Sequence, residues 1–215
     1  MCIRDRLYTW GTPNGRKISI LLEELNVNYT VKPINISGNE QFSEEFLAIS
    51  PNNRIPAIVD HETNIHLMES GAILLYLSQK YDKFCIKGDG YWDMLQWLMW
   101  QMGGLGPMLG QVHHFVKYNQ GKSRYSEERY TSEARRLYKV LETRLTNRDF
   151  IAGDGVGQYS IADISCWPWI SRFEWQELDL HQYPNVRDWY NRIADRPAVQ
   201  KGYHIPHFVN EVPIP

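Results

Sequence analysis

Short apolar runs and helically spaced apolar residues alternate in the first third of the chain. Residues 7–10, LYTW, are typical of a strand. The stretch ISILLEEL follows the turn-like GTPNGRK, and it places Ile18, Leu21, Leu22 and Leu25 at the i, i+3, i+4 and i+7 positions of one helix face. This pattern predicts a strand that leads through a short turn into an amphipathic helix.

The alternation continues beyond this helix. Residues 29–36 predict a second strand, and Pro33 places that strand toward the edge of a sheet, because proline cannot donate to a strand ladder. A polar helix is predicted over 40–49. Residues 55–60 and 65–68 then predict two strands, and the turn-like HETN between them makes a hairpin.

Ser70 is expected to N-cap the next helix, GAILLYLSQKY, because a serine hydroxyl accepts hydrogen bonds from the first free N–H groups of a helix. The predicted order to this point is β-α-β-α-β-β-α, and its βαβ part should be parallel and right-handed. After a break at 83–90 no convincing strand remains. Helical spacing predicts long helices over 91–118 and 126–146.

These elements predict an α/β plus all-α fold with two domains. The N-terminal β-α-β-α-β-β-α domain covers 1–82, a linker covers 83–90, and a C-terminal helical bundle domain covers 91–215. Within the helical domain, Ser160 is followed three residues later by Asp163, which predicts a capping box at a helix start.

The two ends of the chain depart from the regular pattern. Arg4, Asp5 and Arg6 cannot lie unpaired inside a buried strand, because desolvating an isolated charge is costly. We therefore expect MCIRDR to be a non-native or mis-assigned leader, with the ordered strand beginning near Arg6 or Leu7. The tail after about Gly202 has too many prolines for a helix and should pack as an extended arm.

Composition and charge narrow the classes of function. The 215-residue chain is 43% hydrophobic and carries a net charge of −2, so bulk electrostatics suggest neither a nucleic-acid nor a membrane partner. Its three cysteines have no metal-ligand or CxxC spacing, and an odd number favours a reducing compartment. No apolar run reaches 18 residues. We expect a cytoplasmic protein.

The strand order and several sequence motifs resemble the glutathione transferase family. The motifs are TPNG, ISPNN-IPAIVD, ESGAILLYL, LQWL-WQ-GGLGPMLGQ-HHF and YSIADI-CWPW. They are similar to those of the nu class, whose members are bacterial glutathione-dependent disulfide-bond oxidoreductases. The resemblance covers roughly residues 7–200. It implies a thioredoxin-like N-terminal domain, glutathione as co-substrate, and a homodimer.

The resemblance also implies a cis peptide bond before Pro56, which opens the third strand. Ile55 could then pair with the glutathione backbone as an added strand would. Glu69 offers a carboxylate for the γ-glutamyl ammonium of glutathione. Ser70, at a helix N-terminus, offers a hydroxyl and backbone N–H groups for the γ-glutamyl carboxylate.

Four further residues are assigned to glutathione by resemblance. Gln41 and Asn53 are expected at the glycyl end of the tripeptide, where Arg54 could approach its carboxylate, although a solvated surface arginine is an equal alternative. Arg129 matches a position that reaches glutathione in the nu class. Its alternative is an i,i+4 partner on a charged helix face.

The turn TPNG is the candidate site for sulfur chemistry, although it has no cysteine. A helix N-terminus and hydrogen-bond donors aimed at a thiol lower its pKa and so favour the nucleophilic thiolate. We assign this role to Thr12 and Asn14, and Asn14 is the more discriminating residue if the Thr12 hydroxyl caps the helix. Tyr8 is an alternative donor, but a core position is favoured for it.

The predicted function is glutathione-dependent disulfide exchange without a protein cysteine, which is compatible with organic hydroperoxide reduction. Two alternatives stay open. One is a conventional glutathione S-transferase that conjugates small electrophiles, and the other is a non-enzymatic binding or regulatory module. The adjacent His113 and His114 lack partners at metal-ligand spacing, so no metal is expected.

Overall fold

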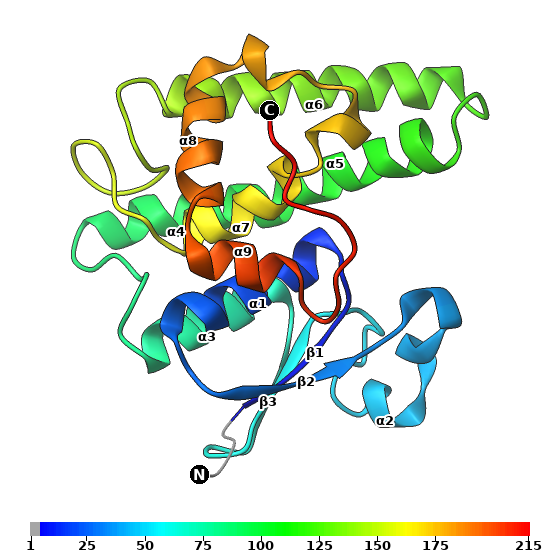
Figure 1. The fold of residues 1–215 in the computed structure, drawn as a ribbon, viewed down its shortest axis with the longest axis vertical. Coiled ribbons are helices and arrows are strands. Elements are labelled where there is room, and N and C mark those ends of the chain that lie inside the picture. Colours follow the sequence, from blue (N-terminus) through cyan, green and yellow to red (C-terminus); the bar gives the residue numbers. More distant parts are fainter. Residues whose placement is uncertain (1–4) are drawn as a thin grey trace. The chain divides into compact units, whose positions relative to one another are not determined.

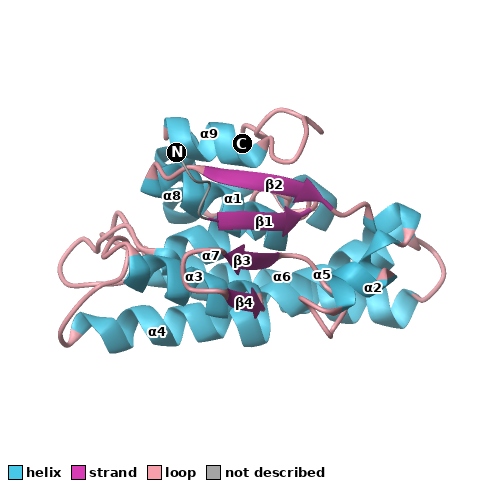
Figure 2. Ribbon diagram, turned by 90° about the horizontal axis from the view of Figure 1, so that it is seen from below, coloured by secondary structure: helices cyan, strands magenta, loops and turns pink. Residues whose placement is uncertain are grey.

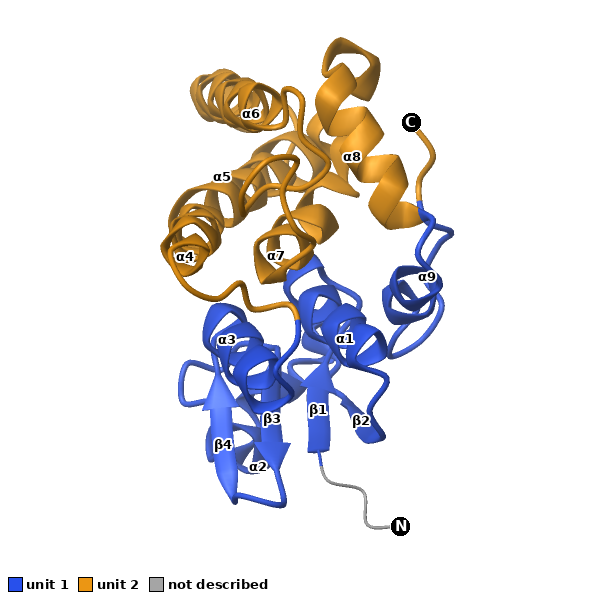
Figure 3. Ribbon diagram, turned by 90° about the vertical axis from the view of Figure 1, so that its left-hand side faces the viewer, with its two compact units in different colours: residues 1–83, 195–212 blue, residues 84–194, 213–215 orange. Residues whose placement is uncertain are grey.

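The computed structural model describes residues 5–215, which form two compact units (Figure 3). Unit 1 comprises the described residues up to Lys83 together with Asp195–Val212, and unit 2 comprises Phe84–Ala194 with Pro213–Pro215. The segment 195–212, which we expected in the helical domain, therefore belongs to the N-terminal unit. No helix in the described part of the chain is long and apolar enough to span a membrane.

Unit 1 contains a four-stranded mixed sheet with the strand order β2-β1-β3-β4 (Figure 2). β2 runs parallel to β1, whereas β3 pairs antiparallel with both β1 and β4. The predicted βαβ unit, hairpin and edge position of the second strand are confirmed. The strands are β1 (Asp5–Thr9), β2 (Tyr29–Pro33), β3 (Ala57–Asp60) and β4 (Ile65–Met68).

Helices α1 and α3 pack side by side on one face of this sheet (Figure 3). The predicted polar helix over 40–49 is mostly wrong, because two 3-10 turns precede a single α-helical turn whose N-cap is Ser43. Helices of unit 1 are α1 (Pro13–Leu25), η1 (Ile36–Gly38), η2 (Glu40–Phe42), α2 (Glu44–Leu47), α3 (Ser70–Lys80) and α9 (Pro197–Tyr203).

Helix α9 belongs to unit 1 because it packs closely against α1 (Figure 1). The Ser19 hydroxyl donates to the Gly202 carbonyl at 2.7 Å. A side chain at Gly202 would come within 2.6 Å of the Ile20 Cα, so only glycine permits this approach. After α9 the chain has no helix, as expected for the extended arm.

The first strand begins at Asp5, one residue earlier than expected. Asp5 is buried, but its carboxylate accepts hydrogen bonds from the Lys80 ammonium at 3.3 Å and the Tyr81 hydroxyl at 2.8 Å. Burial of the charge is therefore compensated by partners at the C-terminal end of α3, its last residue Lys80 and its C-cap Tyr81. Arg6 is exposed, and Arg4 lies outside the described residues.

Unit 2 is helical, with one isolated β-bridge between Ala152 and Gln158 among its described residues. The predicted helix over 91–118 is confirmed as a continuous helical run that contains two π-helical segments. The first π segment directly precedes GP, where Pro107 cannot donate to the regular helical ladder. The elements are α4 (Gly90–Trp100), η3 (Gln101–Leu105), α5 (Gly106–Val112), η4 (His113–Tyr118), α6 (Arg124–Arg144), α7 (Ile161–Ile170), η5 (Phe173–Gln176), η6 (Leu180–Gln182) and α8 (Pro184–Ala194).

The start of α7 is fixed by the capping box that the sequence predicts. The Ser160 hydroxyl caps the helix, and Asp163 accepts a hydrogen bond from the Ser160 backbone N–H at 3.0 Å. The same carboxylate, which is fully buried, also accepts from the Ile151 backbone N–H and the Trp189 indole N–H, both at 2.9 Å. Asp163 thus links three segments of unit 2.

Candidate functional site

Strand register brings most of the candidate residues to one end of the sheet. Tyr8 pairs with Ala57, and Ala57 pairs with Met68, so these three residues lie in one row across β1, β3 and β4. The turn after β1, the residues before β3 and the residues after β4 therefore leave the sheet at the same edge. These segments contain Thr12, Asn14, Ile55, Pro56, Glu69 and Ser70.

The turn after β1 is shaped by glycine and proline. Thr12 is the N-cap of α1 and Pro13 is its first residue, where a missing N–H costs nothing. A side chain at Gly15 would lie 2.2 Å from the Trp10 carbonyl oxygen, so the turn requires glycine at this position. Asn14 lies in the first turn of α1, half-buried.

The Thr12 hydroxyl accepts a hydrogen bond from the Gly15 N–H at 3.3 Å. A hydroxyl that accepts one hydrogen bond can still donate its own proton, so capping the helix does not prevent Thr12 from donating to a thiolate. The first turn of α1 carries no acidic side chain. The positive end of the helix dipole is therefore not neutralised locally and favours an anion beside this turn.

The expected cis peptide bond between Ile55 and Pro56 is present. Ile55 lies outside the β3 ladder, whose register begins at Ala57. Asn53, two residues earlier, has a left-handed backbone with φ of 48°, which asparagine tolerates better than most residues. Arg54 is exposed, and its guanidinium makes no ion pair within residues 5–215. This agrees both with a contact to the glycyl carboxylate of glutathione and with a solvated surface arginine.

Glu69 and Ser70 differ from the expected capping arrangement. The N-cap of α3 is Glu69, which makes no side-chain cap, and Ser70 is the first helical residue. Glu69 has a φ of 69°, which is uncommon outside glycine and costs about 1–3 kcal/mol. Its carboxylate is exposed and forms no ion pair or hydrogen bond with other described residues. Strained residues of this kind gather at functional sites.

Lys17 is a site residue that the sequence interpretation missed. It is fully buried, and its ammonium donates to the Ser70 hydroxyl at 3.2 Å. This cation lies directly beside the N-terminus of α3, so both features favour a carboxylate at Ser70. The sequence does hold a signal for Lys17: it lies four residues before Leu21, so a charged side chain falls on the apolar face of the predicted helix.

Gln41 lies in η2, on the crossover between β2 and β3. The side-chain Oε1 of Gln41 is buried and has no hydrogen-bond partner among the described residues. An unsatisfied buried acceptor costs about 1–3 kcal/mol, and a donor from a ligand would relieve this cost.

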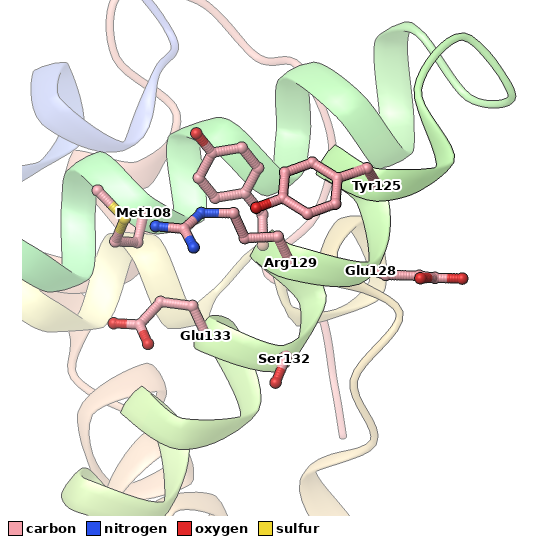
Figure 4. A pocket seen from close by; sticks show the side chains of 7 residues that line it. Met108, Tyr125, Glu128, Arg129, Ser132 and Glu133 are labelled. Carbon is pink, nitrogen blue, oxygen red and sulfur yellow. The ribbon is translucent and has the colours of Figure 1, made fainter.

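Arg129 lies in unit 2 and lines a cavity of about 630 Å³ between α5 and α6. Its guanidinium points toward Met108, and Glu133 reaches into the same space (Figure 4). Glu133 is held by Arg136 through two hydrogen bonds of 2.7 Å, which together with the charge of Arg129 lower the pKa of its carboxyl. Arg129 itself forms no hydrogen bond or ion pair among the described residues. Its charge nevertheless acts on Glu133 four residues later, so glutathione contact and the i,i+4 partner both stay predictions for Arg129.

Tyr8 is buried in a cluster with Ile34, Phe46, Ala57 and Val59, so the favoured core reading is confirmed. The described part of unit 1 contains no cysteine. No group of three or more potential metal ligands occurs among residues 5–215.

Comparisons with known proteins agree with this architecture. The glutathione S-transferase N-terminal domain model matches residues 6–79, and the C-terminal domain model matches 125–192. Disulfide-bond oxidoreductase YfcG of Escherichia coli is 48% identical over 198 residues, which cover 89% of this chain and 91% of the relative. Disulfide-bond oxidoreductase YghU of the same organism is 38% identical, covering 92% of this chain and 73% of the relative.

Two solved structures are also similar. A glutathione transferase from Burkholderia graminis, with two glutathione molecules bound per subunit, is 39% identical with a TM-score of 0.88 and covers 94% of this chain and 88% of its own. A Pseudomonas putida glutathione transferase with one glutathione disulfide bound per subunit is 38% identical with a TM-score of 0.87, covering 94% and 92%. With this agreement in motifs, fold and identity along nearly its whole length, the chain belongs to the glutathione S-transferase family.

Proposed function

We propose that this protein is a glutathione-dependent disulfide-bond oxidoreductase. The observation that carries the proposal is a helix-terminal turn that offers hydrogen-bond donors to a sulfur, within a unit whose described residues contain no cysteine. The reacting thiol is then supplied by the ligand. Relatives named disulfide-bond oxidoreductases and neighbours crystallised with glutathione or its disulfide support this assignment.

In this proposal each polar end of glutathione has a partner. The γ-glutamyl carboxylate binds at Ser70, where Lys17 and the α3 N-terminus add positive charge. The γ-glutamyl ammonium pairs with Glu69, and the Ile55 backbone pairs with the peptide backbone. Gln41, Asn53 and Arg54 bind the glycyl end.

Thr12 and Asn14 donate to the thiolate of the bound glutathione and so lower the pKa of its thiol. The thiolate attacks one sulfur of the substrate disulfide, the S–S bond breaks, and the leaving thiolate takes a proton. A second glutathione attacks the resulting mixed disulfide. The products are glutathione disulfide and two substrate thiols, which balances two electrons. The same proposal includes reduction of organic hydroperoxides, a cytoplasmic location and a homodimer. A monomeric mass in solution would contradict the homodimer.

Parallel assays of one preparation test the proposal. We expect glutathione-dependent turnover of a small organic disulfide to exceed conjugation of a chloro-nitroaromatic in kcat/KM, because the two Escherichia coli relatives are named disulfide-bond oxidoreductases. The reverse preference would show a conventional S-transferase. Calorimetry that detects no glutathione disulfide binding would show a non-enzymatic module.

Arg129 provides a more specific prediction. We expect Arg129→Ala to raise KM for glutathione about 10- to 100-fold, because a hydrogen bond between two charged groups contributes about 1.5–3 kcal/mol. Arg129→Lys should recover part of the loss, since lysine keeps the charge but not the bidentate geometry. Arg124→Ala is the matched control, because Arg124 lies on the same helix and, within residues 5–215, pairs only with the exposed Glu128. An unchanged KM in Arg129→Ala would exclude Arg129 from the glutathione site.

A further inference from the structure

Unit 1 contains a cavity of its own, apart from the one that Arg129 lines in unit 2. None of its lining residues is among those assigned above to glutathione. It has a volume of about 510 Å³ and lies at the ends of β1 and β2, beside the segment that leads into α2. This volume is within the range of small-molecule sites. The floor and walls are formed by Tyr8, Trp10, Pro33, Ile34 and Phe46, and the rim by Lys32, Asn35, Glu40, Ser43 and Glu45.

The phenol of Tyr8 is the polar group of the cavity floor. Tyr8 is only 4% exposed, and its ring packs against Phe46 with a centroid separation of 6.1 Å. No described residue donates a hydrogen bond to its hydroxyl or accepts one from it. The hydroxyl opens into the cavity and is available for a hydrogen bond with a ligand oxygen placed against Tyr8.

Three polar residues at the rim are already used by local turns. Asn35 accepts from the N–H groups of residues 37 and 38, at 3.0 and 3.2 Å. Glu40 accepts from the Asn35 N–H at 2.7 Å, and the Ser43 hydroxyl caps α2 by accepting from the Phe46 N–H. These groups shape the rim, and each has only part of its hydrogen-bonding capacity used by these local turns.

The charged groups of Lys32 and Glu45, also at the rim, are not used by local turns. Both are exposed, and neither forms a hydrogen bond or ion pair within residues 5–215, even with the other. One cavity mouth therefore presents an ammonium and a carboxylate that do not neutralise each other. A ligand with an anionic and a cationic group on a short head would satisfy both.

The aromatic wall of the cavity is held in place from behind. The Trp10 ring meets the His207 ring edge-on, with centroids 4.6 Å apart and planes at 63°. The next residue, Gly11, lies so close to the Val209 side chain that an added Cβ would come within 3.1 Å. The arm after α9 thus supports Trp10, and a wall that is already ordered costs less entropy on binding.

We propose that this cavity binds a free aromatic amino acid with a ring hydroxyl, of which L-tyrosine is the simplest. Its carboxylate pairs with Lys32 and its ammonium with Glu45. Its ring packs between Trp10 and Phe46, and its hydroxyl forms a hydrogen bond with Tyr8.

Titration calorimetry on the full chain with L-tyrosine and L-phenylalanine tests the ring contact. We expect L-tyrosine to bind wild type about 3- to 10-fold more tightly, the effect of one hydrogen bond. Tyr8→Phe keeps the buried ring and should abolish this preference. A preference that persists in Tyr8→Phe, or no binding of either amino acid to wild type, would overturn the proposal.

Ligands that lack one charge test the head group. Lys32→Gln should weaken L-tyrosine and 3-(4-hydroxyphenyl)propanoate about 2- to 5-fold and leave tyramine unaffected, whereas Glu45→Gln should weaken L-tyrosine and tyramine. Lys83→Gln, an exposed lysine elsewhere in unit 1, is the matched control and should change nothing. Saturating glutathione should leave L-tyrosine affinity unchanged, and displacement by glutathione would contradict a separate site.

Discussion

Asn14→Ala is expected to lower kcat/KM for disulfide reduction about 10- to 100-fold at neutral pH. Asn14 lies in the first turn of α1, whose N-terminus carries no acidic side chain. A hydrogen bond to a charged acceptor contributes about 1.5–3 kcal/mol, and this one is strongest when glutathione is a thiolate. Its loss raises the thiol pKa, so the measured pH–rate profile should move to higher pH.

Matched substitutions separate this effect from a general disturbance of the fold. Asn28→Ala changes an exposed asparagine before β2 and should leave the rate unchanged. Thr12→Ser keeps both the cap and the donor, whereas Thr12→Val removes both and should lower activity and thermal stability together. If Asn14→Ala reduced disulfides at the wild-type rate across the pH range, the proposed role of this turn would be wrong.

Local sequence signals predicted the elements that carry the site. Apolar spacing gave α1 and α3, and the order of short strands and helices gave the sheet connections. The position of Thr12 before Pro13 gave the N-cap, because capping depends on residues within one turn. Once strand order was known, register placed the turn after β1 beside Pro56 and Ser70.

Contacts between residues distant in sequence were not predictable in this way. Asp5 tolerates burial because Lys80 and Tyr81 reach it from α3, about 75 residues later. Lys17 donates to Ser70 only because α1 and α3 pack together. Such pairings depend on how the elements pack, and neither periodicity nor turn chemistry encodes them.

Arg129 illustrates the same limit within one helix. Its sequence neighbours allowed an ion pair with Glu133 four residues later, but Glu133 is held by Arg136. Helical spacing identifies the competing partners without deciding between them, since each exposed pair contributes only about 0.3–0.5 kcal/mol.

Asp163→Ala is expected to destabilise the protein by about 3–5 kcal/mol. The substitution leaves three buried donors without their acceptor: the backbone N–H groups of Ile151 and Ser160 and the indole N–H of Trp189. For a chain of this size the melting temperature should fall by about 10 °C or more. Asp154→Ala is the control, because Asp154 is exposed and its backbone carbonyl, not its side chain, accepts the hydrogen bond from the Gly157 N–H. Equal melting temperatures for the two variants would contradict the structural role of Asp163.

Asp163→Asn tests whether the buried group titrates. Burial raises the pKa of Asp163 to about 6, and the hydrogen bonds donated to its carboxylate oppose this shift only in part. The folded state therefore holds a proton between about pH 4 and 6 that the unfolded state has lost, so this stabilisation is complete at low pH and disappears as pH rises through 6. Because asparagine does not titrate, wild type should gain about 2–3 kcal/mol relative to Asp163→Asn between pH 7 and pH 4 in urea unfolding. A difference independent of pH would show that the three N–H donors keep the carboxylate ionised despite its burial.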